Sequence, residues 1–319
     1  MSLIFLFDMN VWIAFVALVV ERLAGYPSSL LKAIGHPVVW IGKLIGWLDK
    51  RFNDRTRRNG VVALLVVLVV TLCITLPISL FLRGLSFGWV VEALLATTLL
   101  AQKDLYVHVK AVANGLNQSL AAGRAEVSKI VGRDPQQLDE TGVAKGAIES
   151  LAENTSDGII APLFWLLIAG LPGIALYKAV NTCDSMVGYK SEKYQLFGWA
   201  SARLDDLANF VPARLTGLLF CLASSANFKR AFAVMRRDAP NHVSPNAGWP
   251  EAAMAGGLDI ALGGPRSYEG RHVELAWMGK GGREVLGADD IDAALKLYAR
   301  ALTYAATLVA LMALGLTAV

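Results

Sequence analysis

The sequence predicts an all-α, polytopic integral membrane protein with about five or six membrane segments. Of its 319 residues, 55% are hydrophobic and only 18% are charged, and the mean hydropathy is +0.48, well above that of a usual soluble domain. Several apolar runs approach the roughly 20 residues that a helix needs to cross a bilayer. We therefore expect one membrane-embedded unit over 1–319, with additional helical and loop regions outside the bilayer.

Six apolar segments are candidates for crossing the membrane. The segment 88–101 is a weaker candidate because it is short and contains Glu92, and the segment 207–227 is weaker because it contains Pro212 and Arg214. The sequence GLPG at 170–173 interrupts a third, which is therefore either broken or re-entrant. The segments are 3–20, 61–82, 88–101, 158–180, 207–227 and 298–319.

The distribution of basic residues predicts the orientation. The polar stretches 21–60, 102–157 and 228–296 hold eight, six and nine Lys or Arg, whereas 181–206 holds three. The positive-inside rule places the three basic stretches in the cytoplasm. Six crossings would then leave 181–206 and both termini outside. A re-entrant pair at 158–180 would return 181–206 to the cytoplasmic side.

Three acidic clusters adjoin apolar segments, and the first spans 145–157. Lys145, Glu149 and Glu153 are spaced four apart, so they share one face of a helix expected over about 139–153. Asn154 to Asp157 are helix-capping residue types directly before an apolar run. A solvated face followed by an ordinary cap would explain the pattern. Alternatively, the carboxylates supply magnesium ligands beside a helix N-terminus that holds phosphate.

The second cluster, 181–194, places Asp184 almost directly after an apolar run. Ionisable groups at membrane depth are costly enough to be functional candidates. Lys190 and Lys193 could pair with Asp184 or with a phosphate. The alternative is an interfacial cap with snorkelling lysines.

The third cluster, 202–217, alternates acidic and basic residues at the start of the next apolar segment: Arg203, Asp205, Asp206 and Arg214. A structural salt-bridge network would also produce this alternation.

The segment 238–270 is rich in proline and glycine around a short helical patch at Glu251–Gly256, which is typical of a functional loop. Its GGLDIALGGP stretch is a weak candidate for a phosphate cradle, with close packing as the alternative. None of the four histidines shows ligand spacing, so we expect structural or surface roles for them and no zinc.

Five stretches together resemble successive motifs of a known family. They are HPVVWIG (36–42), ESLAENTSDGIIAPLFW (149–165), NTCDSMVGYKSEKY (181–194), ARLDDLANFVPARLTG (202–217) and SPNAGWPEAAMAGGL (244–258). In this order they are similar to the adenosylcobinamide-phosphate synthases, the CobD/CbiB family of cobalamin biosynthesis. The sequence departs from the family pattern at two positions: Cys183 replaces an expected aliphatic residue, and Asp259 replaces an expected small residue.

The resemblance implies a membrane enzyme, one catalytic unit over 1–319, that joins the corrinoid adenosylcobyric acid to (R)-1-aminopropan-2-ol phosphate, or to aminopropanol, using ATP. Because ATP and the corrinoid are cytoplasmic, we expect the active site and its cytoplasmic helical and loop regions on that side of the cell inner membrane. A carboxylate must be activated before it reacts with an amine, and we expect an acyl phosphate, magnesium for the triphosphate and Lys or Arg for the phosphates. The implied partners are these substrates and the lipid bilayer, without nucleic acid. The protein could also form a homo-oligomer or associate with other late enzymes of cobalamin biosynthesis. Two other classes of protein stay open as alternatives to an enzyme: a membrane transporter and a non-catalytic membrane sensor.

The candidate site residues fall into three overlapping sets. The catalytic candidates are Lys145, Glu149, Glu153, Asp184 and Lys190. The substrate-binding candidates are Asn154, Ser156, Asn181, Lys193, Arg203, Arg214, Asn246, Trp249 and Glu251. The metal-ligand candidates are Glu149, Glu153, Asp157, Asp184, Asp205 and Asp206.

Overall fold

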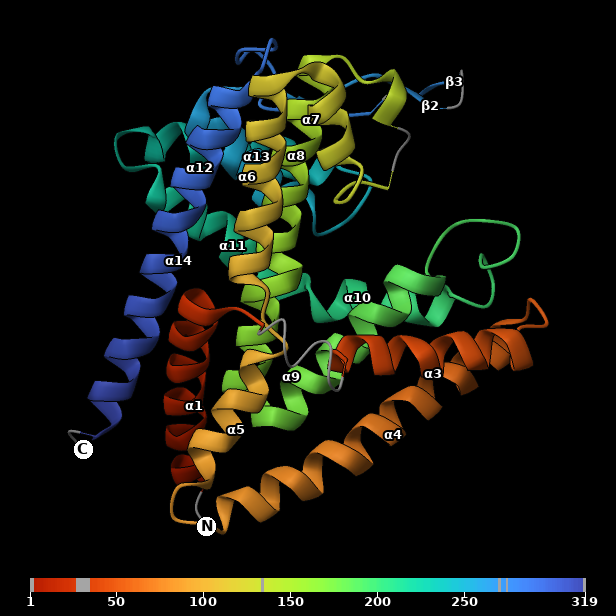
Figure 1. Ribbon diagram of the computed structural model, residues 1–319, viewed down its shortest axis with the longest axis vertical. Coiled ribbons are helices and arrows are strands. Elements are labelled where there is room, and N and C mark those ends of the chain that lie inside the picture. The colour runs from red at the N-terminus through yellow and green to blue at the C-terminus, as the bar shows by residue number, and fades with distance from the viewer. Residues whose placement is uncertain (1–2, 27–34, 133–134, 269–270, 274, 318–319) are drawn as a thin grey trace. The chain divides into compact units, whose positions relative to one another are not determined.

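The computed structural model describes residues 3–26, 35–132, 135–268, 271–273 and 275–317 (Figure 1). It is helical almost throughout, which confirms the all-α prediction. The helices are α1 (Leu3–Ala24), α3 (Pro37–Phe52), α4 (Arg57–Arg83), α5 (Gly88–Thr97), α6 (Gln102–Gln118), α7 (Leu120–Val127), α8 (Glu140–Thr155), α9 (Ala161–Val187), α10 (Trp199–Ala208), α11 (Phe210–Ala223), α12 (Phe228–Asp238), α13 (Gly248–Leu258) and α14 (Ala288–Thr317). The strands are β1 (Leu262–Gly263), β2 (Arg266–Tyr268), β3 (Arg271–Val273) and β4 (Trp277–Met278), paired antiparallel as β1 with β4 and β2 with β3.

The chain divides into two compact units. The first holds Met1–Ala101, Ala161–Asn209 and Leu308–Val319, and the second holds Gln102–Ile160 and Phe210–Thr307. That the whole chain works as a single catalytic unit stays a prediction.

The first unit has an apolar core between α3, α4 and α9. Ile45, Leu64, Val67 and Cys183 are buried in it together, so Cys183 is a packing residue. The backbone of α4 approaches the segment before α10 closely, because a Cβ at Gly60 would lie 1.9 Å from the Phe197 carbonyl oxygen. Only a glycine allows that approach.

Helix α9 is broken inside its apolar run. Ala169 and Gly170 leave helical geometry, and Gly170 has a φ of +62°. The break confirms the interruption predicted at GLPG, although it begins one residue earlier. A helix would have bonded the Leu171 N–H to the Leu167 carbonyl, and both groups are freed by the break.

Side chains from two other helices satisfy the two freed groups, and a third helix supplies an arginine that bonds both of these side chains. The Leu171 N–H donates to Glu92 Oε1 at 3.3 Å, and the Leu167 carbonyl accepts from Asn10 Nδ2 at 3.2 Å. Arg83 joins these partners, since its Nε and Nη2 each donate to the Glu92 carboxylate at 2.9 Å and Nη2 also donates to Asn10 Oδ1 at 2.5 Å. We call Asn10, Arg83 and Glu92 the break-capping network. It explains why the fully buried Glu92 is tolerated in an apolar segment.

Among the described residues, three helical segments are long and apolar enough to cross a membrane: Arg57–Arg83, Glu140–Val187, which includes the break in α9, and Ala288–Leu316. Helices α10 and α11 make a fourth if the bent pair is counted as one span. The ten residues of α5 rise only about 15 Å, half of the roughly 30 Å hydrocarbon core, so the predicted segment 88–101 does not cross alone. The crossing of 3–20, which lies in α1, and the re-entrant arrangement stay predictions.

The second unit contains the polar regions that follow α5 and α11. Helix α6 continues past its predicted end at Asn114–Gly115, and a Cβ at Gly115 would lie 2.9 Å from the Ala122 carbonyl oxygen of α7. Helix α8 begins where predicted, at Asp139, whose Oδ1 accepts the Gly142 N–H at 2.7 Å. Helix α13 is longer than the predicted patch, so 238–270 holds more regular structure than expected.

Candidate active site

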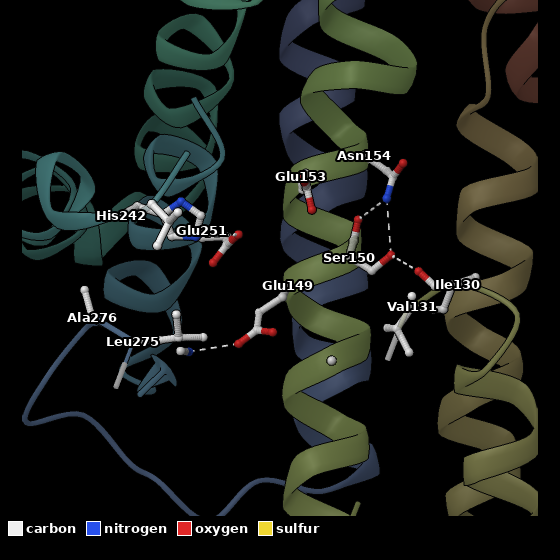
Figure 2. Close-up of a pocket in the computed structure, with 14 residues that line it drawn as sticks. Ile130, Val131, Glu149, Ser150, Glu153, Asn154, His242, Glu251, Leu275 and Ala276 are labelled. Atoms are coloured by element: carbon white, nitrogen blue, oxygen red, sulfur yellow. Dashed lines mark hydrogen bonds and ion pairs between the residues drawn. The ribbon is translucent and has the colours of Figure 1, made fainter. Parts of the chain in front are cut away.

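A cavity of about 500 Å³ lies within the second unit, between α8 and the segments around α13 (Figure 2). Three carboxylates and one imidazole belong to its described lining. The predicted residues Glu149, Glu153, Asn154 and Glu251 all contribute. The complete described lining is Ile130, Val131, Gly132, Gly146, Glu149, Ser150, Glu153, Asn154, His242, Val243, Glu251, Gly263, Leu275 and Ala276.

Helix α8 supplies one wall through residues one helical turn apart. Glu149 is buried, whereas Glu153 is exposed. Ser150 Oγ donates to the Ile130 carbonyl at 2.9 Å, and Asn154 Nδ2 donates to the Ser150 carbonyl, also at 2.9 Å (Figure 2). The bond from Ser150 holds the segment after α7 against α8, whereas the bond from Asn154 lies within α8.

The opposite wall anchors Glu149. The Gly263 N–H donates to Glu149 Oε1 at 2.8 Å, and Figure 2 shows the carboxylate directed away from α8 toward this wall. Gly263 has a φ of +67°, and a Cβ there would lie 2.4 Å from the Ala276 carbonyl oxygen, so the position requires glycine. This N–H serves a carboxylate, and Gly256 lies inside α13 packed against Ala231 of α12. The phosphate cradle considered for GGLDIALGGP is therefore wrong, and close packing explains the glycines.

His242 and Glu251 form a pair on this wall, which the sequence did not predict. His242 Nε2 lies 3.7 Å from Glu251 Oε1. His242 Nδ1 lies 3.0 Å from the Ser244 backbone nitrogen and 3.2 Å from the Ser244 carbonyl oxygen, so the backbone at Ser244 holds this side of the ring and Nε2 faces Glu251. The two residues are nine apart across a turn and a helix start, so no local spacing revealed the pair. The available signal was a histidine in the proline- and glycine-rich stretch 238–270 that also carries Glu251.

Asp238 fixes the segment that carries His242. Its Oδ2 accepts the Gly279 N–H at 2.7 Å, and its carboxylate accepts two bonds from Arg237 at 2.6 and 2.8 Å. Burial raises the pKa of Asp238, but the bonds from Arg237 and from the backbone at Gly279 and Lys280 outweigh burial and hold the pKa below its ordinary value.

The pKa of Asp238 leads to a pH-dependent stability. A carboxyl with a lowered folded-state pKa stabilises fully above its unfolded pKa of about 3.9, and the contribution is lost as the pH falls through the folded value. We expect Asp238→Asn to lower stability by about 1–3 kcal/mol at pH 7 and to lose less than wild type on acidification below about pH 4. Thermal unfolding in detergent at several pH values measures this. Glu284→Gln, at an exposed acid, is the control; equal acid sensitivity of Asp238→Asn and wild type would contradict the assignment.

Other predicted residues of the second unit lie outside the described cavity lining. Lys145 Nζ lies 4.7 Å from the centre of the Trp277 ring. The Arg214 guanidinium lies over the rings of Phe210 and Trp249, at 3.6 and 4.5 Å, and Nη1 is 3.4 Å from Asn246 Oδ1. Arg214, Asn246 and Trp249 are thus brought together, as a separate cluster.

The predicted helix N-terminus at Asp157 is wrong. Residues Ser156–Ile160 form a π-helical turn that continues α8 directly into α9, so no free N–H groups are presented to a phosphate. The capping residue types in NTSD therefore do not start a helix. Ser156 is buried, and its Oγ has no hydrogen-bond partner within the described part of the chain. Such π turns are frequent at functional sites.

The remaining candidates lie in the first unit. Asp205 is buried and accepts from Asn181 Nδ2 at 3.3 Å and from Asn209 Nδ2 at 3.0 Å. Arg203 pairs with Asp206 at 3.8 Å, in line with the salt-bridge alternative. Asp184 is half-buried, close to Gly188, where a Cβ would lie 1.9 Å from Asp184 Oδ1.

Lys193 does not pair with Asp184 as the sequence suggested. It donates to Asp49 Oδ2 at 2.8 Å and to the Tyr194 hydroxyl at 2.7 Å, and these hydrogen bonds raise the pKa of Lys193. Lys190 is exposed. A function for the first-unit candidates stays a prediction.

The predicted metal ligands are not gathered into one cluster. Glu149 and Glu153 share the cavity, Asp157 lies in the π turn, and the other three lie in the first unit. Among the described residues, no three His, Cys, Asp or Glu side chains converge as a metal site. Two carboxylates are nevertheless enough for a magnesium ion that keeps waters and binds substrate phosphates.

Comparison with known proteins places the chain in a family. A model of the CobD/CbiB proteins matches residues 14–298. The cobalamin biosynthesis protein CobD of Brucella anthropi is 51% identical over 296 residues, covering 88% of this chain and 90% of the relative. The protein of the same name from Rhodobacter capsulatus is 50% identical over 302 residues, covering 93% and 96%. No solved structure matches the chain. This chain therefore belongs to the CobD/CbiB family of cobalamin biosynthesis proteins.

Proposed function

We propose that this protein is an ATP-dependent amide ligase of cobalamin biosynthesis. It joins the propionate carboxylate of adenosylcobyric acid to (R)-1-aminopropan-2-ol phosphate, or to free aminopropanol, and so yields adenosylcobinamide phosphate or its free-alcohol counterpart. The observation that carries the proposal is the cavity in which Glu149, Glu153 and Asn154 of α8 meet His242 and Glu251. Membership of the family supports it, and we propose the cytoplasmic face of the cell membrane as its location.

The cavity suits the activation of a carboxylate. Glu149 and Glu153, one helical turn apart, would hold magnesium, which when bound neutralises the charge of the nucleotide phosphates. The bond from Gly263 fixes the Glu149 carboxylate, and a carboxylate keeps further acceptor sites after one such bond. A preset carboxylate loses little entropy when it binds the ion, so the Gly263 N–H serves the site by orienting Glu149.

The described lining contains no lysine or arginine, so the substrate phosphates need cations from elsewhere. We propose Lys145, one turn before Glu149 on α8, as the nearest cation along this helix face. Arg214 with its aromatic neighbours, and Lys190, Lys193 and Arg203 of the first unit, stay candidates for phosphate or corrinoid contacts.

A direct assay tests the proposed function. Purified protein in detergent is incubated with adenosylcobyric acid, magnesium-ATP and either amine, and the corrinoid mass is followed. We expect the mass to increase by the amine minus one water, with stoichiometric release of ADP. An unchanged corrinoid mass in several detergents with both amines would contradict the proposal, and transport of a corrinoid by vesicles containing the protein would favour the transporter class instead.

A further inference from the structure

The proposed amide formation requires that the amine substrate lose a proton, and activation of the carboxylate does not remove that proton. The amine substrate is an ammonium ion near neutral pH and has no lone pair for attack. Overall, a carboxylate, an ammonium ion and ATP become an amide, ADP and phosphate, with release of one proton. An acceptor for that proton must lie within reach of the ammonium nitrogen.

His242 is the one imidazole of the described cavity lining. The titratable groups that share this lining with it are Glu251 of α13 and Glu149 and Glu153 of α8. Three carboxylates attract an ammonium group into the cavity. Carboxylates have ordinary pKa values near 4, so they are weak acceptors for an ammonium proton, whereas an imidazole ordinarily titrates close to neutral pH.

The surroundings of His242 hold the ring in a defined orientation. The backbone at Ser244 contacts Nδ1, whose distance to the Ser244 carbonyl oxygen is 3.2 Å. When Nδ1 carries the ring proton and donates it to this carbonyl, Nε2 is the acceptor nitrogen, 3.7 Å from Glu251 Oε1. Glu251 is buried, and its carboxylate is close enough to Nε2 to pair with the imidazolium that proton transfer would form. The backbone at Ser244 therefore orients the ring, and Glu251 is placed to stabilise its protonated form.

We propose that His242 is the catalytic proton acceptor for the amine substrate and that Glu251 is its positioning residue. This inference rests on the proposed function. The ammonium group transfers one proton to His242, and the freed nitrogen lone pair attacks the acyl carbon of the acyl phosphate. The new C–N bond forms as the C–O bond to phosphate breaks, and the phosphate leaves with that electron pair and takes the second nitrogen proton. His242 then returns its proton to solvent.

A nucleophile that is neutral at pH 7 separates this role from a structural one. Hydroxylamine needs no deprotonation and converts an acyl phosphate to a hydroxamate. We expect His242→Gln to lower kcat with aminopropanol phosphate at pH 7 by roughly a hundredfold or more, and to change hydroxamate formation less than about threefold. The deficit with aminopropanol phosphate should shrink as the pH rises toward 9, and Glu251→Gln should give a smaller deficit of the same pattern. His108→Gln, at an exposed histidine of α6, is the matched control and should retain full activity with both nucleophiles.

The outcomes distinguish the two proposals. Equal loss with both nucleophiles in a His242→Gln protein that keeps the wild-type gel-filtration profile would overturn the role of His242 and leave the ligase reaction intact. Unaltered turnover of aminopropanol phosphate would overturn it as well. Failure of wild type to form either product would contradict the proposed function itself, and with it this inference.

Discussion

Replacement of Glu149 by glutamine is expected to lower kcat by roughly a hundredfold or more, which is on the order of 3 kcal/mol of transition-state stabilisation. Glutamine has nearly the same volume and can still accept the bond from the Gly263 N–H, so the wall of the cavity stays in place. The negative charge that would hold magnesium is lost. The apparent magnesium affinity, read from a titration of turnover against magnesium concentration, should therefore weaken together with kcat.

The exposed Glu153 provides the comparison at the same site. We expect Glu153→Gln to have a smaller effect, because an exposed carboxylate interacts more weakly than a buried one. Glu140→Gln, at an exposed position in the first turn of α8, is the control and should retain wild-type kinetics. Wild-type kinetics of both single variants and of the double variant would mean that the acids of α8 belong to a solvated helix face.

The second large effect is expected in stability. Arg83→Met should destabilise the protein by about 3–5 kcal/mol, because it leaves the fully buried Glu92 carboxylate without its cation. Thermal unfolding in detergent measures the loss. Arg58→Met, at an exposed arginine of the same helix, should change stability by less than about 0.5 kcal/mol.

A double-variant cycle separates the ion pair from its neighbours. Arg83→Met combined with Glu92→Gln should cost less than the two single changes added together, since neither charge is then left alone. The double variant should still be less stable than wild type, because Asn10 Oδ1 has lost the Arg83 guanidinium that bonded to it. Strict additivity would show that the two side chains do not act as one network.

The parts of the structure that follow from local patterns were predictable from the sequence. Apolar runs gave the all-α class, Asp139 marked the start of α8, and the four-residue spacing placed Glu149 and Glu153 on one face. These inferences need only helical periodicity and capping chemistry, which act between near neighbours. The family motifs extended them to a candidate list over the whole chain.

What the sequence did not reveal depends on contacts between distant residues. The Gly263 N–H that holds Glu149 is 114 positions away, and His242 meets Glu251 only through the fold of the 238–258 segment. The prediction of a helix start at NTSD was wrong for a different reason. Its side chains can cap a helix or lie inside one, and here the packing of the π turn against α11 prevails over the capping preference.

The break-capping network also sets an order of events during biosynthesis. Asn10, Arg83 and Glu92 all precede Leu167 and Leu171 in the chain. A membrane protein is made from its N-terminus, so the three capping side chains emerge from the ribosome before the broken helix that needs them. When the apolar segment that follows Ile160 enters the lipid, the side chains that bond its freed groups, Glu92 as acceptor and Asn10 as donor, have already been synthesised. If it were synthesised first, it would carry an unsatisfied N–H and carbonyl into hydrocarbon, at a cost of several kcal/mol for each group.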